Sequence, residues 1–145
     1  MQNWNDRVGP GDTVYHLGDF AMGNKKYCAS IFHRLNGKIT LVQGNHDKHM
    51  PRWFKDQFVE VHHYLEINPK DQKICLMHFP IESWNKCHRG AWHLHGHCHN
   101  NLTTGQNRKR MDVGVDAWDY SPVSLEEISE AMKSRGFVQV DHHGA

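Results

Sequence analysis

Four short apolar segments of this sequence each end in a compact polar cluster. The segments are rich in β-branched and aromatic residues, which are typical of strands. The clusters are Gly18-Asp19, Gly44-Asn45-His46-Asp47, His78 and Gly96-His97-Cys98-His99. Ligands of α/β proteins collect where the carboxyl ends of several strands meet, so the pattern predicts that these clusters converge on one site.

Strands and helices are expected to alternate along the chain. Residues 28–35 carry apolar side chains at helical spacing, and Ser124 with Glu127 forms a capping box that opens a second helix. The expected strands cover residues 13–17, 38–43, 92–95, 111–115 and 137–140, with 59–67 and 73–77 as the arms of a hairpin. This alternation predicts an α/β fold in a single domain over residues 1–145.

The composition excludes several classes of protein. Lysine and arginine number 17 against 16 aspartates and glutamates, and the net charge of +1 disfavours an extended nucleic-acid surface. No apolar run approaches the roughly 18 residues of a membrane-spanning helix, and residues 1–6 lack the features of a secretory signal. The 4 cysteines show no C-x-x-C spacing, which favours reduced thiols in a cytoplasmic protein. The oligomeric state is left open.

The chemistry of the polar clusters points to a metal ion. The sequence has 14 histidines, and none of them belongs to a run as long as a purification tag. Carboxylate, amide and imidazole ligands together suit a borderline divalent ion such as Mn, Fe, Co, Ni or Zn. Glycines in three of the clusters allow the backbone to bend sharply beside a bound group. We therefore expect a divalent-metal site at the strand ends.

At these clusters the sequence resembles the calcineurin-like metallophosphoesterase family. The family signature runs D-x-H, G-D, G-N-H-D or G-N-H-E, a single H, and G-H-x-H, and four of these five blocks stand in order here. The phrases His78-Phe79-Pro80 and residues 111–116 are most similar to small bacterial and phage members. The resemblance implies a β-sandwich flanked by helices, in the layer order αββα, that binds two divalent ions when it is complete.

The resemblance also implies roles for individual residues. Asp19 would bridge the two ions, and Asn45 would contact both metal and substrate. His46 would be the general acid that protonates the leaving alkoxide, and Asp47 would hold the ring of His46 in orientation. The residues that would hold the ions are Asp19, Asn45, His78, His97 and His99. The implied reaction is hydrolysis of a phosphomonoester or phosphodiester by metal-activated water.

The D-x-H block of that signature is absent from this sequence. No such triplet precedes Asp19, and only 12 residues lie ahead of the expected strand at 13–17. A parallel strand and its crossover need more residues than this. We expect that the first strand is missing and that Met1 lies inside the first crossover helix. One metal site should then be well formed, and the second should bind weakly.

Two functional interpretations follow from the sequence. The first is a phosphoesterase that acts on a small substrate, with its activity impaired by the absent block. The alternative is a non-catalytic metal-binding scaffold, or a truncated fragment of such an enzyme. A nucleic-acid substrate is less favoured because the charge is nearly balanced.

Further residues are assigned supporting roles. Arg89 lies in the loop between the third and fourth clusters, so we expect it to clamp the substrate phosphate together with Asn45. Residues 108–110 form a basic triplet that is expected in a solvated turn. Asp112 and Asp116 are expected to support the fourth cluster through hydrogen bonds. The histidines that should fill the sheets are His16, His93 and His95.

Overall fold

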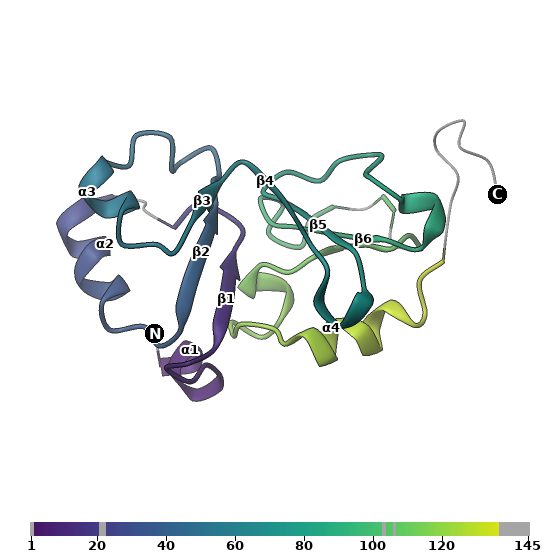
Figure 1. The fold of residues 1–145 in the computed structure, drawn as a ribbon, viewed down its shortest axis with the longest axis horizontal. Coiled ribbons are helices and arrows are strands. Elements are labelled where there is room, and N and C mark those ends of the chain that lie inside the picture. Colours follow the sequence, from purple (N-terminus) through teal and green to yellow (C-terminus); the bar gives the residue numbers. More distant parts are fainter. Residues whose placement is uncertain (1, 21–22, 103, 106, 137–145) are drawn as a thin grey trace.

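The strands of the computed structural model, which describes residues 2–20, 23–102, 104–105 and 107–136, form two sheets (Figure 1). The first sheet contains β1 (Thr13–His16), β2 (Lys38–Val42) and β3 (Val61–His62), all parallel. The second contains β4 (Tyr64–Ile67), β5 (Ile74–Met77), β6 (Trp92–His95) and β7 (Arg110–Asp112), in the order β4-β5-β6-β7. Among the described strands, only β4 runs antiparallel to its neighbour. The predicted α/β fold is confirmed.

Helices cover the outer side of the first sheet and one side of the second. The helices are α1 (Gln2–Arg7), α2 (Lys25–Phe32), α3 (Arg52–Lys55) and α4 (Leu125–Met132). In Figure 1, α2 and α3 lie on the side of the first sheet that faces away from the second sheet, and α4 lies beside the second sheet. The predicted capping box opens α4: the Ser124 hydroxyl accepts the N–H of Glu127, and the Glu127 carboxylate accepts the N–H of Ser124.

Strand β2 is buried on both faces after its exposed first residue, Lys38. Its residues Ile39 and Leu41 pack with α2, α3 and the ring of Phe58. Its residue Val42 packs instead against the second sheet. The cluster between the sheets and α4 consists of Leu17, Val42, Ile74, Leu76, Trp92, Leu94, Met111, Ile128 and Met132. This packing fixes the strands, and with them the positions of the loops at their ends.

The expected strand at 59–67 is in fact two strands in different sheets. Val61–His62 pairs with β2, and after His63 the chain enters β4 and pairs with β5. The hairpin of β4 and β5 is confirmed, and its turn contains the 3-10 helix Pro69–Asp71. The predicted strand at 137–140 lies outside the described residues. Within the described part of the chain, no helix is long and apolar enough to cross a membrane.

The basic triplet at 108–110 is not a solvated turn, as the sequence had suggested. Arg108 bridges to Gly136, and Arg110 begins β7. Both arginines are 5% exposed, and the Arg108 guanidinium lies 4.8 Å from the ring centre of Trp84. Pairing of β7 with β6 draws these side chains under the loop that precedes β6. The polar residues of the triplet alone do not reveal this burial.

His93 on β6 makes the free energy of unfolding depend on pH. Its Nδ1 donates to the carbonyl of Cys75 at 3.0 Å, and its Nε2 accepts the N–H of Ile81 at 3.1 Å, so the folded protein holds a neutral ring. Burial lowers the pKa of His93 from 6.5 to about 4. Between these values the unfolded chain binds a proton that the folded chain does not. The contribution of His93 to the unfolding free energy is therefore complete above pH 6.5 and is lost as the pH falls toward 4.

Replacing His93 with glutamine should remove this pH dependence. The lowered pKa of His93 sets the size of the effect. We expect the difference in unfolding free energy between wild type and H93Q to change by about 3 kcal/mol between pH 7 and pH 4. Urea unfolding of the chelated proteins at several pH values measures this difference in unfolding free energy. The exposed His49 gives the matched control, H49Q, which should follow the wild type. Parallel curves for wild type and H93Q would contradict the assignment.

Candidate metal centre

The turn after β1 is shaped to present Asp19. Gly18 has φ of +105° and Asp19 has φ of +58°, both in the left-handed region. A Cβ atom on Gly18 would lie 2.4 Å from His78 Nδ1 and 2.6 Å from the backbone nitrogen of Gly44. Only glycine therefore fits at position 18, because the loops after β1, β2 and β5 meet there.

The loop after β2 locks onto that turn. A Cβ atom on Gly44 would lie 2.4 Å from Asp19 Oδ1. The buried Asp47 carboxylate accepts the N–H of Asp19 at 2.5 Å and the N–H of Gly44 at 2.9 Å. The backbone N–H of His46 donates to Asp19 Oδ1 at 2.9 Å. Asp47 thus positions Asp19, a role that the sequence reasoning did not assign to it.

His16 supports the same turn from the end of β1. Its Nδ1 accepts the N–H of Gly18 at 3.2 Å, and its ring packs between those of Trp4 and Phe20. Burial in this position lowers the pKa of His16 to about 4. The ring therefore stays neutral at physiological pH and remains able to accept that hydrogen bond.

His78 lies at the centre of the site and its orientation is fixed. Its side chain is 2% exposed, and its Nδ1 donates to the carbonyl of Leu17 at 2.6 Å. Because Nδ1 is engaged with this carbonyl, Nε2 is the ring nitrogen that faces the other clusters. His78 Nε2 lies 3.0 Å from Asn45 Oδ1 and 3.2 Å from His97 Nδ1. It lies 3.3 Å from Asp19 Oδ2.

The separations of the other three atoms from His78 Nε2 match those between ligands of one metal ion. Ligand atoms bound at about 2.1 Å to a common ion are about 3.0 Å apart at right angles and about 3.4 Å apart in a tetrahedron. The observed separations from His78 Nε2, 3.0 to 3.3 Å, fall in this range. Ligand atoms of Asp19, His78 and His97 all lie within 4.8 Å of one another. This group of three residues could hold a metal ion.

His99 lies outside this group and is paired with a carboxylate. Its Nδ1 lies 2.6 Å from Asp116 Oδ2, and the hydrogen bond and charge of Asp116 raise the pKa of His99. Asp112 accepts the backbone N–H of Asn100 at 2.9 Å. The expected support of this loop by Asp112 and Asp116 is therefore present. His97 and His99 both have positive φ, at +67° and +48°, as strained residues at functional sites often do.

The structure does not bring Arg89 to this site. Arg89 lies in the 3-10 helix Cys87–Arg89, and the next residue, Gly90, accepts a hydrogen bond from the Gln72 side chain at the start of β5. His78 follows the opposite end of β5. The side chain that does border the site is Phe79, whose ring centre lies 4.9 Å from that of His78 and which is 38% exposed. Its place directly after His78 was the available sequence signal.

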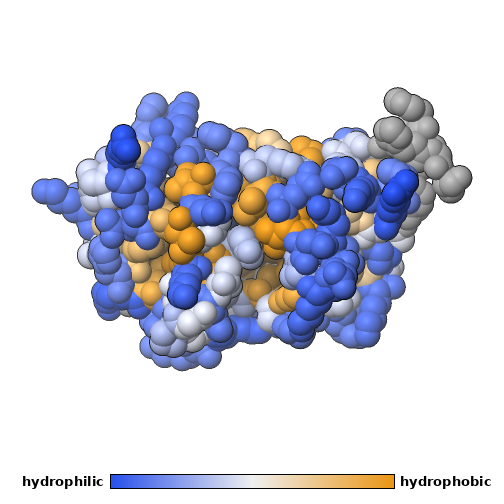
Figure 2. Space-filling view, viewed as in Figure 1, coloured by the Kyte–Doolittle hydropathy of each residue, from blue (hydrophilic) through white to orange (hydrophobic). Residues whose placement is uncertain are grey.

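A large cleft opens beside the ligand group. It has a volume of about 830 Å³ and lies between β1, the second sheet and α4. Asp19, His78, His97 and His99 line one part of it, and the rest is largely apolar, including Val14, Ile67, Leu76, Val113 and Leu125. Figure 2 shows hydrophobic atoms gathered toward the middle of one face of the molecule. The cleft gives a ligand access to the site.

Gly18 offers a sharp test of this geometry. G18A should lower the unfolding free energy by about 3 kcal/mol or more, because overpacking against His78 adds to the cost of a left-handed alanine. G90A is the matched control, since Gly90 has φ of +90° but nothing within 4 Å of an added Cβ atom. G90A should cost about 1–2 kcal/mol. If urea unfolding showed that G18A and G90A lose the same amount of unfolding free energy, the close approach at Gly18 would be contradicted.

No protein-family model matches the chain, but individual relatives do. The uncharacterized protein MJ1445 of Methanocaldococcus jannaschii is 34% identical over 135 residues, which cover 88% of this chain and 70% of MJ1445. The chain belongs to the family of MJ1445. Another relative is the gene 66 protein of Mycobacterium phage D29, which is 27% identical over 157 residues. The match covers 88% of this chain and 78% of the phage protein.

One solved structure shows that the fold recurs. A protein of unknown function from Aquifex aeolicus, AQ665, superposes with a TM-score of 0.70 at 28% identity. The alignment covers 89% of this chain and 81% of AQ665. A novel archaeal phosphodiesterase superposes with a TM-score of 0.48 at 20% identity, which is too distant to transfer a function.

Proposed function

We propose that this protein is a metal-dependent phosphoesterase that hydrolyses a phosphomonoester or phosphodiester. The observation that carries the proposal is the convergence of Asp19 Oδ2, Asn45 Oδ1, His78 Nε2 and His97 Nδ1 beside an open cleft. The resemblance of the four polar clusters to the metallophosphoesterase signature supports it. We include the αββα sandwich in the proposal, supported by the apolar cluster that joins the two sheets.

Asp19, Asn45, His78 and His97 would hold a divalent ion, with Mn, Fe, Co, Ni or Zn suited to this donor set. Such an ion supplies a Lewis acid that activates water and draws charge from a phosphoryl group. Asp19 provides the only formal negative charge among the four donors. His99 and Asp19 would contribute to a second, weaker site, to which His99 would offer Nε2 because its Nδ1 is held by Asp116.

His46 is the proposed general acid. It is exposed on the loop after β2, and its backbone is held against Asp19. A histidine placed beside the reacting phosphoryl group can give its proton to the leaving alkoxide oxygen. Asn45 can direct its amide N–H groups toward a phosphoryl oxygen while its Oδ1 faces His78.

The dimensions of the cleft favour a small substrate. Its volume of about 830 Å³ is within the range of about 300–1,000 Å³ that is usual for small-molecule sites. The nearly balanced charge, +1 overall, disfavours a nucleic-acid substrate. A small or terminal phosphoester is therefore the proposed substrate class.

Hydrolysis of bis-p-nitrophenyl phosphate with added Mn²⁺ tests the proposal. Wild type should turn over, the chelated protein should not, and H46A should be slower by about 10²–10⁴-fold. H49A, which removes an exposed histidine of the same loop region, is the matched control and should retain the wild-type rate. A folded, metal-loaded protein without turnover would favour the alternative of a non-catalytic metal-binding scaffold.

A further inference from the structure

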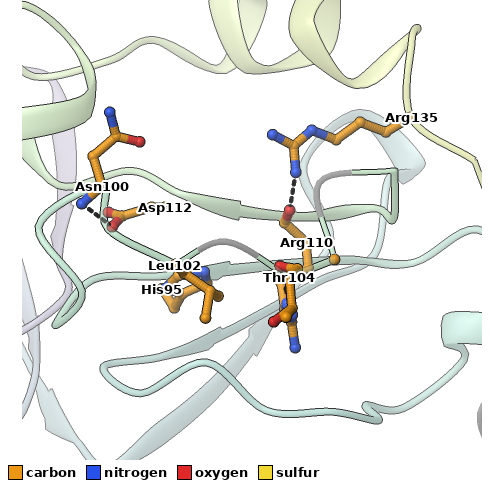
Figure 3. Close-up of a pocket in the computed structure, with 8 residues that line it drawn as sticks. His95, Asn100, Leu102, Thr104, Arg110, Asp112 and Arg135 are labelled. Carbon is orange, nitrogen blue, oxygen red and sulfur yellow. Dashed lines mark hydrogen bonds between the residues drawn. The ribbon is translucent and has the colours of Figure 1, made fainter.

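A second, smaller cavity lies beside the loop that carries His97. It has a volume of about 60 Å³. Its polar lining comes from His95, Asn100, Thr104, Arg110, Asp112 and Arg135 (Figure 3). None of the four converging metal-site donors lines it. Asn100 and Thr104 are exposed at its rim, which leaves the cavity open to solutes.

Arg110 brings a buried positive charge to this cavity with little compensation. Its side chain is 4% exposed and donates to the carbonyl oxygens of Ile81 at 2.9 Å and Thr104 at 3.2 Å, both neutral acceptors. The carboxylate of Glu82 lies 3.8 Å away. Glu82 is 73% exposed and is already paired with Arg108 at 3.0 Å. A buried guanidinium is costly unless a charged partner faces it.

Arg135 adds a second guanidinium at the same cavity. It donates to the backbone carbonyl of Arg110, as the dashed line in Figure 3 shows. Among the residues that the structure describes, no carboxylate forms an ion pair with Arg135. Burial and the charge of Arg110 lower the pKa of Arg135, which shows how unfavourable the two neighbouring positive charges are in this position.

The one acid on the cavity wall is directed elsewhere. Asp112 accepts the backbone N–H of Asn100 at 2.9 Å (Figure 3). Its other oxygen accepts the backbone N–H of Gly114 at 2.8 Å, so both oxygens are engaged. Two guanidinium groups against one carboxylate leave the lining with an excess of one positive charge. An anion that enters the cavity would therefore meet Arg135, which forms no ion pair among the described residues, and Arg110, whose ion pair with Glu82 is long at 3.8 Å.

The size of the cavity limits what that anion can be. A water-sized atom needs about 10–15 Å³ of such a volume, so about 60 Å³ holds about four to six heavy atoms. Phosphate has five. A nucleobase or a sugar ring is too large. Guanidinium groups are also the side chains best matched to phosphoryl oxygens.

We propose that Arg110 and Arg135 bind a phosphate-sized oxyanion in this cavity, at a site separate from the metal centre. The oxyanion is either free phosphate or a second phosphoryl group of a substrate whose first phosphoryl group lies at the metal centre. Binding itself requires no metal ion. The site can therefore be tested independently of the proposed hydrolysis.

Titration calorimetry with inorganic phosphate and chelated protein tests the site. Wild type should bind, and R135Q should bind about tenfold or more weakly, as expected when a charge-assisted hydrogen bond is lost. R135K keeps the charge and should lie between them. R34Q removes an exposed arginine elsewhere and should match wild type. Thermal unfolding of each variant checks that it is folded.

The outcomes separate the site from the metal centre. Phosphate affinity that is equal in wild type and R135Q, or that is absent from chelated wild type, overturns the proposal. Titration of a nucleoside 3′,5′-bisphosphate into Mn²⁺-loaded protein then identifies the source. A weaker affinity in R135Q assigns the site to a second phosphoryl group of the substrate. An unchanged bisphosphate affinity, with phosphate binding still lost, assigns it to free phosphate.

Discussion

Replacing Asp19 with asparagine is expected to reduce the metal-dependent hydrolysis of bis-p-nitrophenyl phosphate by about 10²–10³-fold, the usual effect of losing one preorganised electrostatic group. Asn45, His78 and His97 are neutral donors, so the variant would present a divalent ion with no negative charge. The substitution keeps the size of the side chain in a site where Gly44 leaves no spare room. The loss should therefore reflect charge rather than packing.

The measurement is the initial rate at saturating Mn²⁺, with D56N as the matched control. Asp56 is exposed and lies at the end of α3, away from the ligand group. The D56N variant should keep the wild-type rate of hydrolysis. If D19N hydrolysed the substrate as fast as D56N, Asp19 could not be a ligand for the catalytic ion.

An added D-x-H segment is expected to raise turnover by about 10²-fold. β1 lies at the edge of the first sheet and, among the described strands, pairs only with β2. The free edge borders the cleft that Asp19 and His99 line. An extended segment carrying D-x-H, fused ahead of α1 by a linker, could pair with this edge and supply two more ligands beside His99. Two ions can clamp a phosphoryl group from both sides.

The same fusion with N-x-A in place of D-x-H is the control for that experiment. Rates are compared at matched Mn²⁺ concentrations, and bound Mn²⁺ is counted for each protein. The D-x-H fusion should bind a second ion and react faster, whereas the control should resemble the unfused chain. Identical rates for the two fusions would show that the absent block is not what limits activity.

The ligand group was predictable from the sequence because each of its residues lies just after a strand. The runs before Gly18, Gly44 and His78 each form a strand, and the two sheets bring their carboxyl ends together. The glycines were signals of the same kind, since Gly18 and Gly44 stand where the turns approach most closely. Asp47 was predicted to orient the His46 ring. Its hold on the backbone N–H groups of Asp19 and Gly44 was missed, because a sequence pattern does not display such contacts.

The misplacement of Arg89 has a topological cause. β5 and β6 are parallel, so the loop that leaves the carboxyl end of β5 must return to the amino end of β6. Arg89 lies near the end of that loop and is carried away from His78. The burial of Arg108 and Arg110 was likewise decided by pairing of distant strands. Strand direction, not residue type, determined each of these outcomes.

Titration of Mn²⁺ into the chelated protein, followed by electron paramagnetic resonance of the free ion, tests the central claim most directly. The four converging donors predict one tightly bound Mn²⁺ per chain. H78A should weaken this site by about 10²-fold or more, judged from the effect of lesser changes around metal ligands. H62A, which removes a histidine at the far edge of the first sheet, should leave it intact. Equal titration curves for H78A and H62A would contradict the metal centre and the function proposed from it.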